Sequence, residues 1–447
     1  MNERIAKLME NPKKGLLILA WPMILSTFFS TLLNIVDFFF VGGLGPNALA
    51  AVQLSFPIFF LIIAVGSGIS IGSTSLIAKR LGEKNKEWAE ETGLHTLLLA
   101  VILAVAVTCL APFAGEMSKG LGGSPEVAQL TADYIGVIFL GAIIFFPVFA
   151  FASMMQAEGD TKRVMKMSVT FTVANIILDP IFIYTLGMGV KGAAIATVLA
   201  EAIAFSLYIR HIIVRKASYL QIHPRRFIYT PQIIKNILKV GLPMAVAQIG
   251  LSVVSLAINL ILSGFGDKAI SAYGIGFRLD SLAIMPVLGL GAGAVPLISY
   301  FRGRKDFRGA QKVQRYALKL VVMYGMGLGA VMFLLAGVVP SLFTNDPDVL
   351  LMASDYLKIM AVSYPFFGIA IITSSSFQGL GKGMPSLVIM LSRTVAIAIP
   401  LCYYLANYTD LGVNGVLFGI VISAVASAAM AVVWIESVFR KLCGARK

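Results

Sequence analysis

Charged side chains are scarce in this chain, and acidic side chains are the scarcest. Of the 447 residues, 36 are Lys or Arg and only 22 are Asp or Glu, so charged residues make up 13% of the sequence. Soluble domains carry about 25% charged residues, and the mean hydropathy here is +0.87. A water-soluble fold of this length could not solvate so much apolar surface. The composition predicts a membrane protein and excludes a soluble or disordered one.

Cysteine is also rare, and the common catalytic motifs are missing. The three cysteines, Cys109, Cys402 and Cys443, show no CxxC spacing, so we expect neither a disulfide framework nor a cysteine metal site. The sequence contains no Walker A motif, no HExxH and no nucleophile elbow. We therefore expect a protein that is not an enzyme and that carries no cofactor.

Long apolar runs occupy most of the chain instead. A membrane-crossing helix needs about 20 apolar residues, so the length allows about twelve spans and no large soluble domain. The first run is too long for a signal peptide. The sequence predicts an all-α membrane protein with spans at residues 15–41, 48–78, 92–114, 127–155, 164–187, 190–214, 232–264, 269–300, 314–339, 348–377, 384–407 and 412–438.

The basic residues lie mostly on one side of the predicted membrane layout. With alternating spans, most Lys and Arg residues fall on the side of the N-terminus, and only Lys119, Lys191 and Lys268 fall in the opposite loops. By the positive-inside rule, both termini are expected in the cytoplasm of a multi-pass protein of the inner (plasma) membrane. The net charge of +14 is then a topology signal, and we expect no nucleic-acid partner.

The second half of the chain repeats the first half. At an offset of 221 residues, Pro22 aligns with Pro243, and Gly68 and Gly72 align with Gly289 and Gly293. Six spans per half is an even number, so the halves are parallel repeats related by a pseudo-twofold axis along the membrane normal. The predicted domains are an N-terminal tail (1–14), an N-lobe (15–214), a linker (215–231), a C-lobe (232–438) and a C-terminal tail (439–447).

Two acidic residues break the symmetry of this repeat. Asp37 in the first span aligns with Ile258, and Asp179 in the fifth span aligns with Leu401. Ionisable residues inside membrane spans are costly and are functional candidates by default. Because the second copy of the scaffold has aliphatic residues at both places, we expect the two acids to serve function in the N-lobe.

The neighbours of these acids favour a cation site. Asn175 and Asp179 are four residues apart and share a helix face, as do Ala193 and Thr197 in the next span. Pro180 frees a backbone carbonyl near the same face. Carboxylate, amide, hydroxyl and carbonyl oxygens suit a hard cation such as Na⁺, and two carboxylates in a dry pocket also suit H⁺. In the alternative reading, Asn175 and Asp179 only satisfy each other.

Other residues are candidates with smaller roles. Pro22 lies well inside the first span, where a proline kinks or hinges a helix, so we expect it to act as a hinge. In the C-lobe, the ionisable residues are expected either to pair across helices or to line the cavity. The candidates for cavity or substrate contacts are Asn34, Gln53, Tyr184, Arg278, Asp280 and Arg393.

The chain resembles the multidrug and toxic compound extrusion (MATE) transporters. The resemblance rests on the twelve-span parallel repeat, the Leu-Asn-Ile-Val-Asp run ending at Asp37, the stretch 175–180 and the Gly-Val-Lys-Gly-Ala-Ala run at 189–194. It covers essentially the whole chain. The stretch 247–256 lacks the acid that the NorM-like branch carries in its seventh span. The chain is therefore more similar to the DinF-like and archaeal branch.

The resemblance implies a function and a set of ligands. Members of the family are Na⁺- or H⁺-coupled antiporters that expel organic, often cationic compounds by alternating access between two six-helix lobes. The implied cation ligands are the side chains of Asp37, Asn175, Asp179 and Thr197, with the main-chain oxygen of Ala193. The implied partners are small organic cations, drugs and membrane lipid, and we expect a monomer. A lipid-linked precursor flippase of the same superfamily is the alternative; it would need several cations along the cavity.

Overall fold

The computed structural model describes residues 3–223 and 227–444, and every regular element in these ranges is helical. Eleven helical segments are long and apolar enough to cross a membrane, and the bent pair α12 and α13 supplies a twelfth. The predicted all-α membrane fold with twelve spans is therefore confirmed. The residues Met1, Asn2, Pro224, Arg225, Arg226 and 445–447, which belong to the predicted tails and linker, lie outside the described ranges.

The helices divide into an N-lobe, α1 to α8, and a C-lobe, α9 to α16. The N-lobe consists of α1 (Glu3–Glu10), α2 (Pro12–Gly42), α3 (Pro46–Gly82), α4 (Lys86–Thr108), α5 (Ala114–Gly120), α6 (Pro125–Ala157), α7 (Thr161–Pro180) and α8 (Gly189–Ile209). The C-lobe consists of α9 (Pro231–Ser263), α10 (Asp267–Gly303), α11 (Phe307–Leu334), α12 (Pro347–Met360), α13 (Tyr364–Gly379), α14 (Gly383–Leu391), α15 (Ile399–Asn407) and α16 (Val413–Gly444). Short π-helical segments, η2 (Ile181–Thr185), η3 (Arg210–Val214) and η6 (Ser392–Ala398), extend α7, α8 and α14.

Several helices begin at capping residues that are visible in the sequence. The side chains of Asn11, Asn85, Ser124, Asp306 and Asp346 each accept a hydrogen bond from a backbone N–H of the first turn that follows. Three of these helices, α2, α6 and α12, also have a proline in the first turn. Such caps satisfy amide groups that have no partner inside the helix, which fixes where each helix starts.

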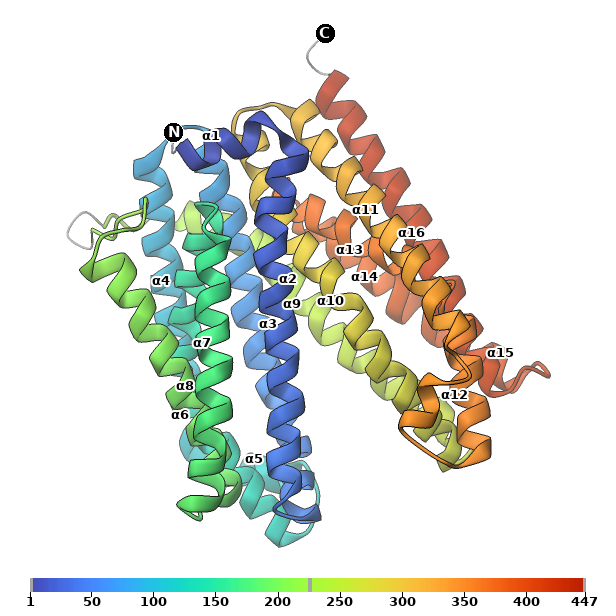
Figure 1. Ribbon diagram of the computed structural model, residues 1–447. Coiled ribbons are helices and arrows are strands. Elements are labelled where there is room, and N and C mark those ends of the chain that lie inside the picture. The colour runs from blue at the N-terminus through green and yellow to red at the C-terminus, as the bar shows by residue number, and fades with distance from the viewer. Residues whose placement is uncertain (1–2, 224–226, 445–447) are drawn as a thin grey trace.

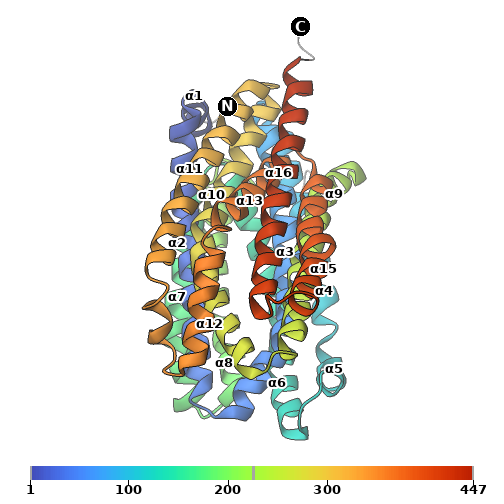
Figure 2. The same cartoon turned by 90° about the vertical axis from the view of Figure 1, so that its right-hand side faces the viewer.

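The two lobes stand side by side and diverge along their length. In Figure 1 they lie close together in the upper half and splay apart in the lower half, and both ends of the chain lie at the top. A quarter turn brings the C-lobe in front of the N-lobe, so the molecule is narrower in that view (Figure 2). We call the end with both termini the terminal end and the other the open end.

The sequence repeat is visible in the geometry of individual helices. Helices α3 and α10 have 37 residues each, and both start and end 221 positions apart. The glycines that precede them, Gly45 and Gly266, have φ values of +103° and +92°, which L-residues rarely adopt. Lys84 and Lys305 after the two helices also share a positive φ. The two lobes are therefore built from the same structural unit.

Glycines allow the lobes to meet near the terminal end. A Cβ at Gly72 of α3 would lie 2.3 Å from the carbonyl oxygen of Ile237 in α9, and a Cβ at Gly293 of α10 would lie 2.7 Å from the backbone nitrogen of Ala20 in α2. The contact of α3 with α9 thus mirrors the contact of α10 with α2, as a pseudo-twofold axis requires. The hydroxyl of Tyr300 adds a 2.5 Å hydrogen bond to the carbonyl of Ala157 across the lobes.

Two local features differ from the expectations above. Residues 1–14, expected as a plain tail, include helix α1, whose residues Ile5 and Leu8 are buried in the core. The tenth predicted span is broken into α12 and α13, which meet at an angle of 54°. The first span, by contrast, is assigned as one helix through Pro22.

Candidate functional site

The N-lobe candidates come from three helices that pack against one another. Asp37 lies on α2, Asn175 and Asp179 on α7, and Thr197 on α8. Asn175 and Asp179 are almost completely buried, with exposed fractions of 0% and 1%, and Thr197 is buried as well. The fold therefore brings together residues that are up to 160 positions apart (from 37 to 197). Their polar atoms meet inside the lobe.

Hydrogen bonds link the residues of α7 and α8. The amide nitrogen of Asn175 donates to Asp179 Oδ1 at 3.2 Å and to Thr197 Oγ1 at 3.5 Å. The Thr197 hydroxyl in turn donates to the carbonyl of Ala193 at 3.0 Å. Asn175 and Asp179 do bond to each other, as the alternative reading expected, but this bond uses only one oxygen of the pair.

Three oxygens of this cluster have no partner at all. Asp37 Oδ1, Asn175 Oδ1 and Asp179 Oδ2 are buried acceptors without a hydrogen bond. They are three of the seven such side-chain atoms in the described part of the chain. Buried polar atoms normally have partners, so three unpartnered acceptors in one place mark a candidate site for a cation or a proton. The carboxyl groups of Asp37 and Asp179 are close enough to interact electrostatically.

Local backbone features hold α7 and α8 in this arrangement. Helix α7 ends at Pro180 and continues as the π-helical segment η2, a type of turn that is frequent at functional sites. A Cβ at Gly192 of α8 would lie 2.5 Å from the carbonyl oxygen of Phe182 in η2. Only glycine permits this approach, which places the first turns of α8, with Ala193 and Thr197, against the end of α7.

The remaining N-lobe candidates lie outside the buried cluster. Asn34 and Gln53 are exposed, and the Asn34 amide bonds to the carbonyl of Ser30 one turn earlier at 2.8 Å. Tyr184 in η2 is 46% exposed, and its hydroxyl donates to the carbonyl of Phe40 in α2 at 2.5 Å. Tyr184 therefore ties η2 to the helix that carries Asp37.

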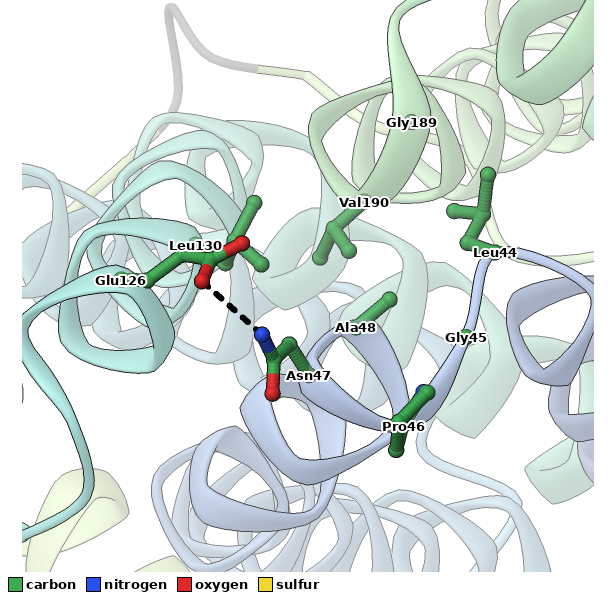
Figure 3. A pocket seen from close by; sticks show the side chains of 9 residues that line it. All are labelled: Leu44, Gly45, Pro46, Asn47, Ala48, Glu126, Leu130, Gly189 and Val190. Carbon is green, nitrogen blue, oxygen red and sulfur yellow. Dashed lines mark hydrogen bonds between the residues drawn. The ribbon is translucent and has the colours of Figure 1, made fainter.

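A small pocket lies beside the cluster but contains none of its acids. Its volume is about 290 Å³, and Figure 3 shows Asn47 donating to Glu126 on one side and apolar side chains on the other. The pocket residues Ala48 and Val190 pack in one apolar group with Ala193. The pocket is thus a neighbour of the site, separated from it by packed side chains.

The C-lobe candidates do not form ion pairs with one another. Arg278 is exposed, and the guanidinium of Arg393 lies 4.9 Å from the ring centre of Phe367. Asp280 accepts hydrogen bonds from the hydroxyls of Tyr356 and Tyr364. Of the two alternatives, pairing of these charges across helices is not found: Asp280 does join helices of the C-lobe, but through tyrosine hydroxyls.

One buried acid at the terminal end was missed in the sequence because it directly follows a span. Glu158 accepts bonds from the Ser218 hydroxyl at 2.6 Å and from the backbone N–H groups of Tyr219 and Leu220 at 2.6 and 3.2 Å. Burial raises the pKa of Glu158 to about 7, although all three hydrogen bonds act to lower it. Glu158 fastens the first part of the linker to the N-lobe.

Helix α4 holds the second part of the linker. Glu90 accepts from the N–H of Gln221 at 2.9 Å, and His95 accepts from the N–H of Thr230 at 2.8 Å. The His95 ring also packs against Tyr229. His95 therefore has a structural role. A cavity of about 650 Å³ adjoins the linker, lined by side chains of both charges from α1 and α7 together with Glu158.

The comparisons with known proteins agree with the fold. A family model described as MatE matches residues 22–181 and 243–404, one segment in each half and more than half of the chain. The multidrug export proteins MepA of Staphylococcus haemolyticus and Staphylococcus saprophyticus are 27% and 29% identical; the matches cover 96% and 94% of this chain and 94% and 93% of theirs.

Solved structures give the same result over nearly the full length. A transporter of the MOP superfamily from Pyrococcus furiosus is 32% identical, with a TM-score of 0.94 and 99% of both chains covered. A structure described as MATE in the straight conformation has a TM-score of 0.96 at 32% identity, covering 99% of this chain and 100% of that one. The chain therefore belongs to the MATE family, a family of transporters and not of enzymes.

Proposed function

We propose that the protein exports organic, often cationic compounds from the cell by antiport against H⁺ or Na⁺. The similarity to the MepA proteins, which are multidrug export proteins, supports this substrate class. The proposed ion coupling is supported by the three unpartnered buried oxygens on Asp37, Asn175 and Asp179. A cluster of buried oxygens can bind a cation, and competition between that cation and an organic cation would couple their transport.

Either coupling ion has ligands in this cluster. A proton can be shared by the carboxyl groups of Asp37 and Asp179, because two neighbouring buried carboxylates cannot both carry a charge without a large cost. A Na⁺ ion would take the same carboxylates, the carbonyl oxygens of Asn175 and Ala193 and the Thr197 hydroxyl, a set of hard oxygen ligands. The donor set therefore fits Na⁺, and the experiment below separates the two ions.

The charge distribution supports an orientation. The basic residues of α1 and those that follow α3, α6 and α10 lie at the terminal end, so the positive-inside rule favours a cytoplasmic location of that end. The lobes meet at this end through Gly72, Gly293 and Tyr300. In this orientation the lobes meet on the cytoplasmic side and diverge toward the outside, and Pro22 is the proposed hinge of α2.

The absence of an acid between residues 247 and 256 of α9 supports placement in the DinF-like branch.

The flippase alternative has less support, because the two cations it would use do not converge. Arg278 is exposed and Arg393 packs on Phe367. We propose that the protein works as a monomer in the plasma membrane.

Efflux from proteoliposomes tests the proposed function. The purified protein is reconstituted with a fluorescent organic cation inside, and efflux is followed under an inward Na⁺ gradient, an inward proton gradient or no gradient. We expect efflux under at least one gradient and only a slow leak without it. Equal efflux under all three conditions would overturn coupled antiport, and transport of a lipid-linked pyrophosphate in its place would support the flippase.

A further inference from the structure

The tenth span is interrupted at a place where its counterpart in the N-lobe is continuous. Helix α12 ends at Met360 and α13 begins at Tyr364, with a bend of 54° between them. The equivalent span in the N-lobe is the single 33-residue helix α6. Pro365 in the first turn of α13 lacks the N–H that an unbroken helix would use, and its repeat position in α6 is Ile143. The break is specific to the C-lobe.

The carboxylate of Asp280 bridges this break. Asp280 Oδ2 accepts from the hydroxyl of Tyr356 at 2.6 Å, and Asp280 Oδ1 accepts from the hydroxyl of Tyr364 at 2.8 Å. Tyr356 lies on α12 before the break, and Tyr364 lies on α13 after it. Each oxygen therefore holds one half of the span, and Asp280 itself is anchored on α10.

Glycines shape the surroundings of the bridge. A Cβ at Gly276 of α10 would lie 2.2 Å from the ring of Tyr356, so only glycine lets this ring lie against the helix. On α11, a Cβ at Gly325 would lie 2.6 Å from the backbone of Pro365, and one at Gly329 would lie 2.5 Å from the carbonyl oxygen of Ala361. The broken backbone is packed against α11 on one side and fastened to Asp280 by its tyrosines.

The groups that face Asp280 are tyrosines and not cations. Besides Tyr356 and Tyr364, Tyr273 packs edge to face on Tyr356, and Tyr324 of α11 donates its hydroxyl to the carbonyl of Ala283. Among the described residues, no Lys, Arg or His forms an ion pair with Asp280.

The charged residues of the other elements packed against α10 lie away from Asp280. Lys79 of α3 meets α10 at its terminal end, where its carbonyl lies against Gly303. Arg278, on α10 itself, is exposed, and Arg393 of η6 lies over Phe367. Lys358 of α12 pairs at 3.9 Å with Asp355 of the same helix. A partly buried carboxylate without a counter-charge is the kind of group that binds a proton.

We infer that Asp280 is a second proton-binding site and that its protonation controls the bend of the tenth span. As a carboxylate it accepts both tyrosine hydroxyls and holds α12 and α13 at the observed angle. A proton from water adds to one oxygen, forms an O–H bond and neutralises the charge. That oxygen becomes a weaker acceptor and its new hydrogen needs an acceptor of its own, so one tyrosine is released and the bend relaxes.

The role of this bend in transport rests on the proposed antiport. The dependence of the bend on a proton does not rest on it. Asp280 aligns with Phe59 in the repeat, so the N-lobe has no equivalent clamp. Asp280 acts here through the position of α12, and it is a positioning residue and not a ligand of the exported compound.

Spin-label distances across the C-lobe test the inference. Labels at Leu351 of α12 and Leu260 of α9, both about two-thirds exposed, report the position of α12. Cys109 and Cys443 are replaced by Ser, and Cys402, which is completely buried, stays. For wild type we expect the distance to shift by about 2 Å or more between mildly alkaline and acidic buffer.

Variants assign the shift to Asp280. Asp280→Asn should show the acidic distance at both pH values, and Asp280→Glu should restore the response. Tyr364→Phe, which leaves the acid in place, should move the alkaline distance toward the acidic one and serves if Asp280→Asn does not fold. The matched control is Tyr324→Phe, which removes a hydroxyl bonded to a backbone carbonyl at the same helix interface and should leave the response unchanged.

A response that persists in Asp280→Asn, or a wild type without a response, would overturn the inference. Asp37→Asn separates this result from the coupling proposal, because the C-lobe response should remain intact in that variant. If Asp37→Asn exports normally while the response at Asp280 is present, the N-lobe assignment fails and the clamp stands.

Discussion

The N-lobe and the C-lobe share one helical plan, but the acidic residues inside them differ in their hydrogen bonding. In the N-lobe, Asp37 and Asp179 lie on α2 and α7 and leave buried oxygens without partners. In the C-lobe, the equivalent positions are Ile258 and Leu401, and Ile258 is buried in an apolar core. The C-lobe acid, Asp280, has both oxygens bonded by tyrosines. Buried oxygens with spare acceptor capacity are candidate cation ligands, whereas a carboxylate already bonded by two hydroxyls is suited to holding helices in place.

A pair of equivalent tyrosines shows how the repeat has diverged. Tyr134 of α6 and Tyr356 of α12 occupy equivalent positions. Tyr134 lies near Asp37 and Asp179, and Tyr356 bonds to Asp280. Each lobe thus places a tyrosine beside its own acid, although the acids come from different helices. The scaffold is shared, and the chemistry of each lobe is set by a few substitutions.

Removal of an N-lobe acid should have the largest effect. In the proposed function Asp37 and Asp179 are ligands of the coupling ion, so we expect Asp37→Asn or Asp179→Asn to lower gradient-driven efflux about tenfold or more. The measurement is efflux of an organic cation from proteoliposomes. Asp133→Asn is the control, because Asp133 bonds only to Gln129 on its own helix in the described structure. An equal loss of efflux in Asp133→Asn would mean that Asp37 and Asp179 have no specific role in coupling.

A side chain at the contact between the lobes should have the next largest effect. Gly72→Ala places a Cβ 2.3 Å from the carbonyl oxygen of Ile237, whereas Gly274→Ala on α10 meets open space. We expect Gly72→Ala to destabilise the closed terminal end by about 1 to 3 kcal/mol, measured as increased labelling of cysteines introduced there. Gly274→Ala should leave labelling unchanged. Equal labelling of both variants would mean that the contact does not hold the lobes together.

Loss of the Thr197 hydroxyl should have a smaller effect that depends on the ion. Thr197→Val keeps the shape but removes one oxygen ligand, so Na⁺-driven efflux should need about 2- to 10-fold more Na⁺. Proton-driven efflux should hardly change, because the shared proton lies on the carboxyl groups. A comparison of the two gradients in this variant therefore sharpens the choice of ion. The same loss under both gradients would indicate a packing role for Thr197.

The smallest effect is expected at Glu158, which lies outside both acid centres. Burial raises the pKa of Glu158 from its ordinary 4.5 to about 7 in the folded protein. Its stabilising contribution is thus fully present below about pH 4.5 and is lost as the pH rises through about 7. Hydrogen exchange of the linker amides at 219 and 220, corrected for intrinsic rates, should show weaker protection above pH 7 in wild type. Glu158→Gln should abolish this dependence; an unchanged pH profile would contradict the assignment.

The sequence was sufficient for the parts of the site that depend on the repeat. The asymmetry at Asp37 and Asp179 and the four-residue spacing of Asn175 with Asp179 predicted residues that the fold does bring together. These signals are visible because charged residues inside apolar runs are few and their helical periodicity is simple. Whether these residues bind the coupling ion stays a prediction.

Other features depend on contacts between distant helices and could not be predicted. The break before Tyr364 and Pro365 was not predicted, because a proline inside a span does not decide whether the helix breaks: α2 continues through Pro22. The partners of Asp280 lie 76 and 84 residues away in the sequence. Glu158 was overlooked because its partners belong to a polar linker whose path over the N-lobe has no periodic signal.

Cation release on substrate binding tests the central claim most directly. An organic cation is added to purified protein in weakly buffered detergent solution, and released H⁺ and Na⁺ are measured with a pH indicator and a Na⁺ electrode. We predict that wild type and Asp355→Asn release one of these ions, and that the double variant Asp37→Asn, Asp179→Asn releases neither while remaining folded. Full release from the double variant would contradict the account.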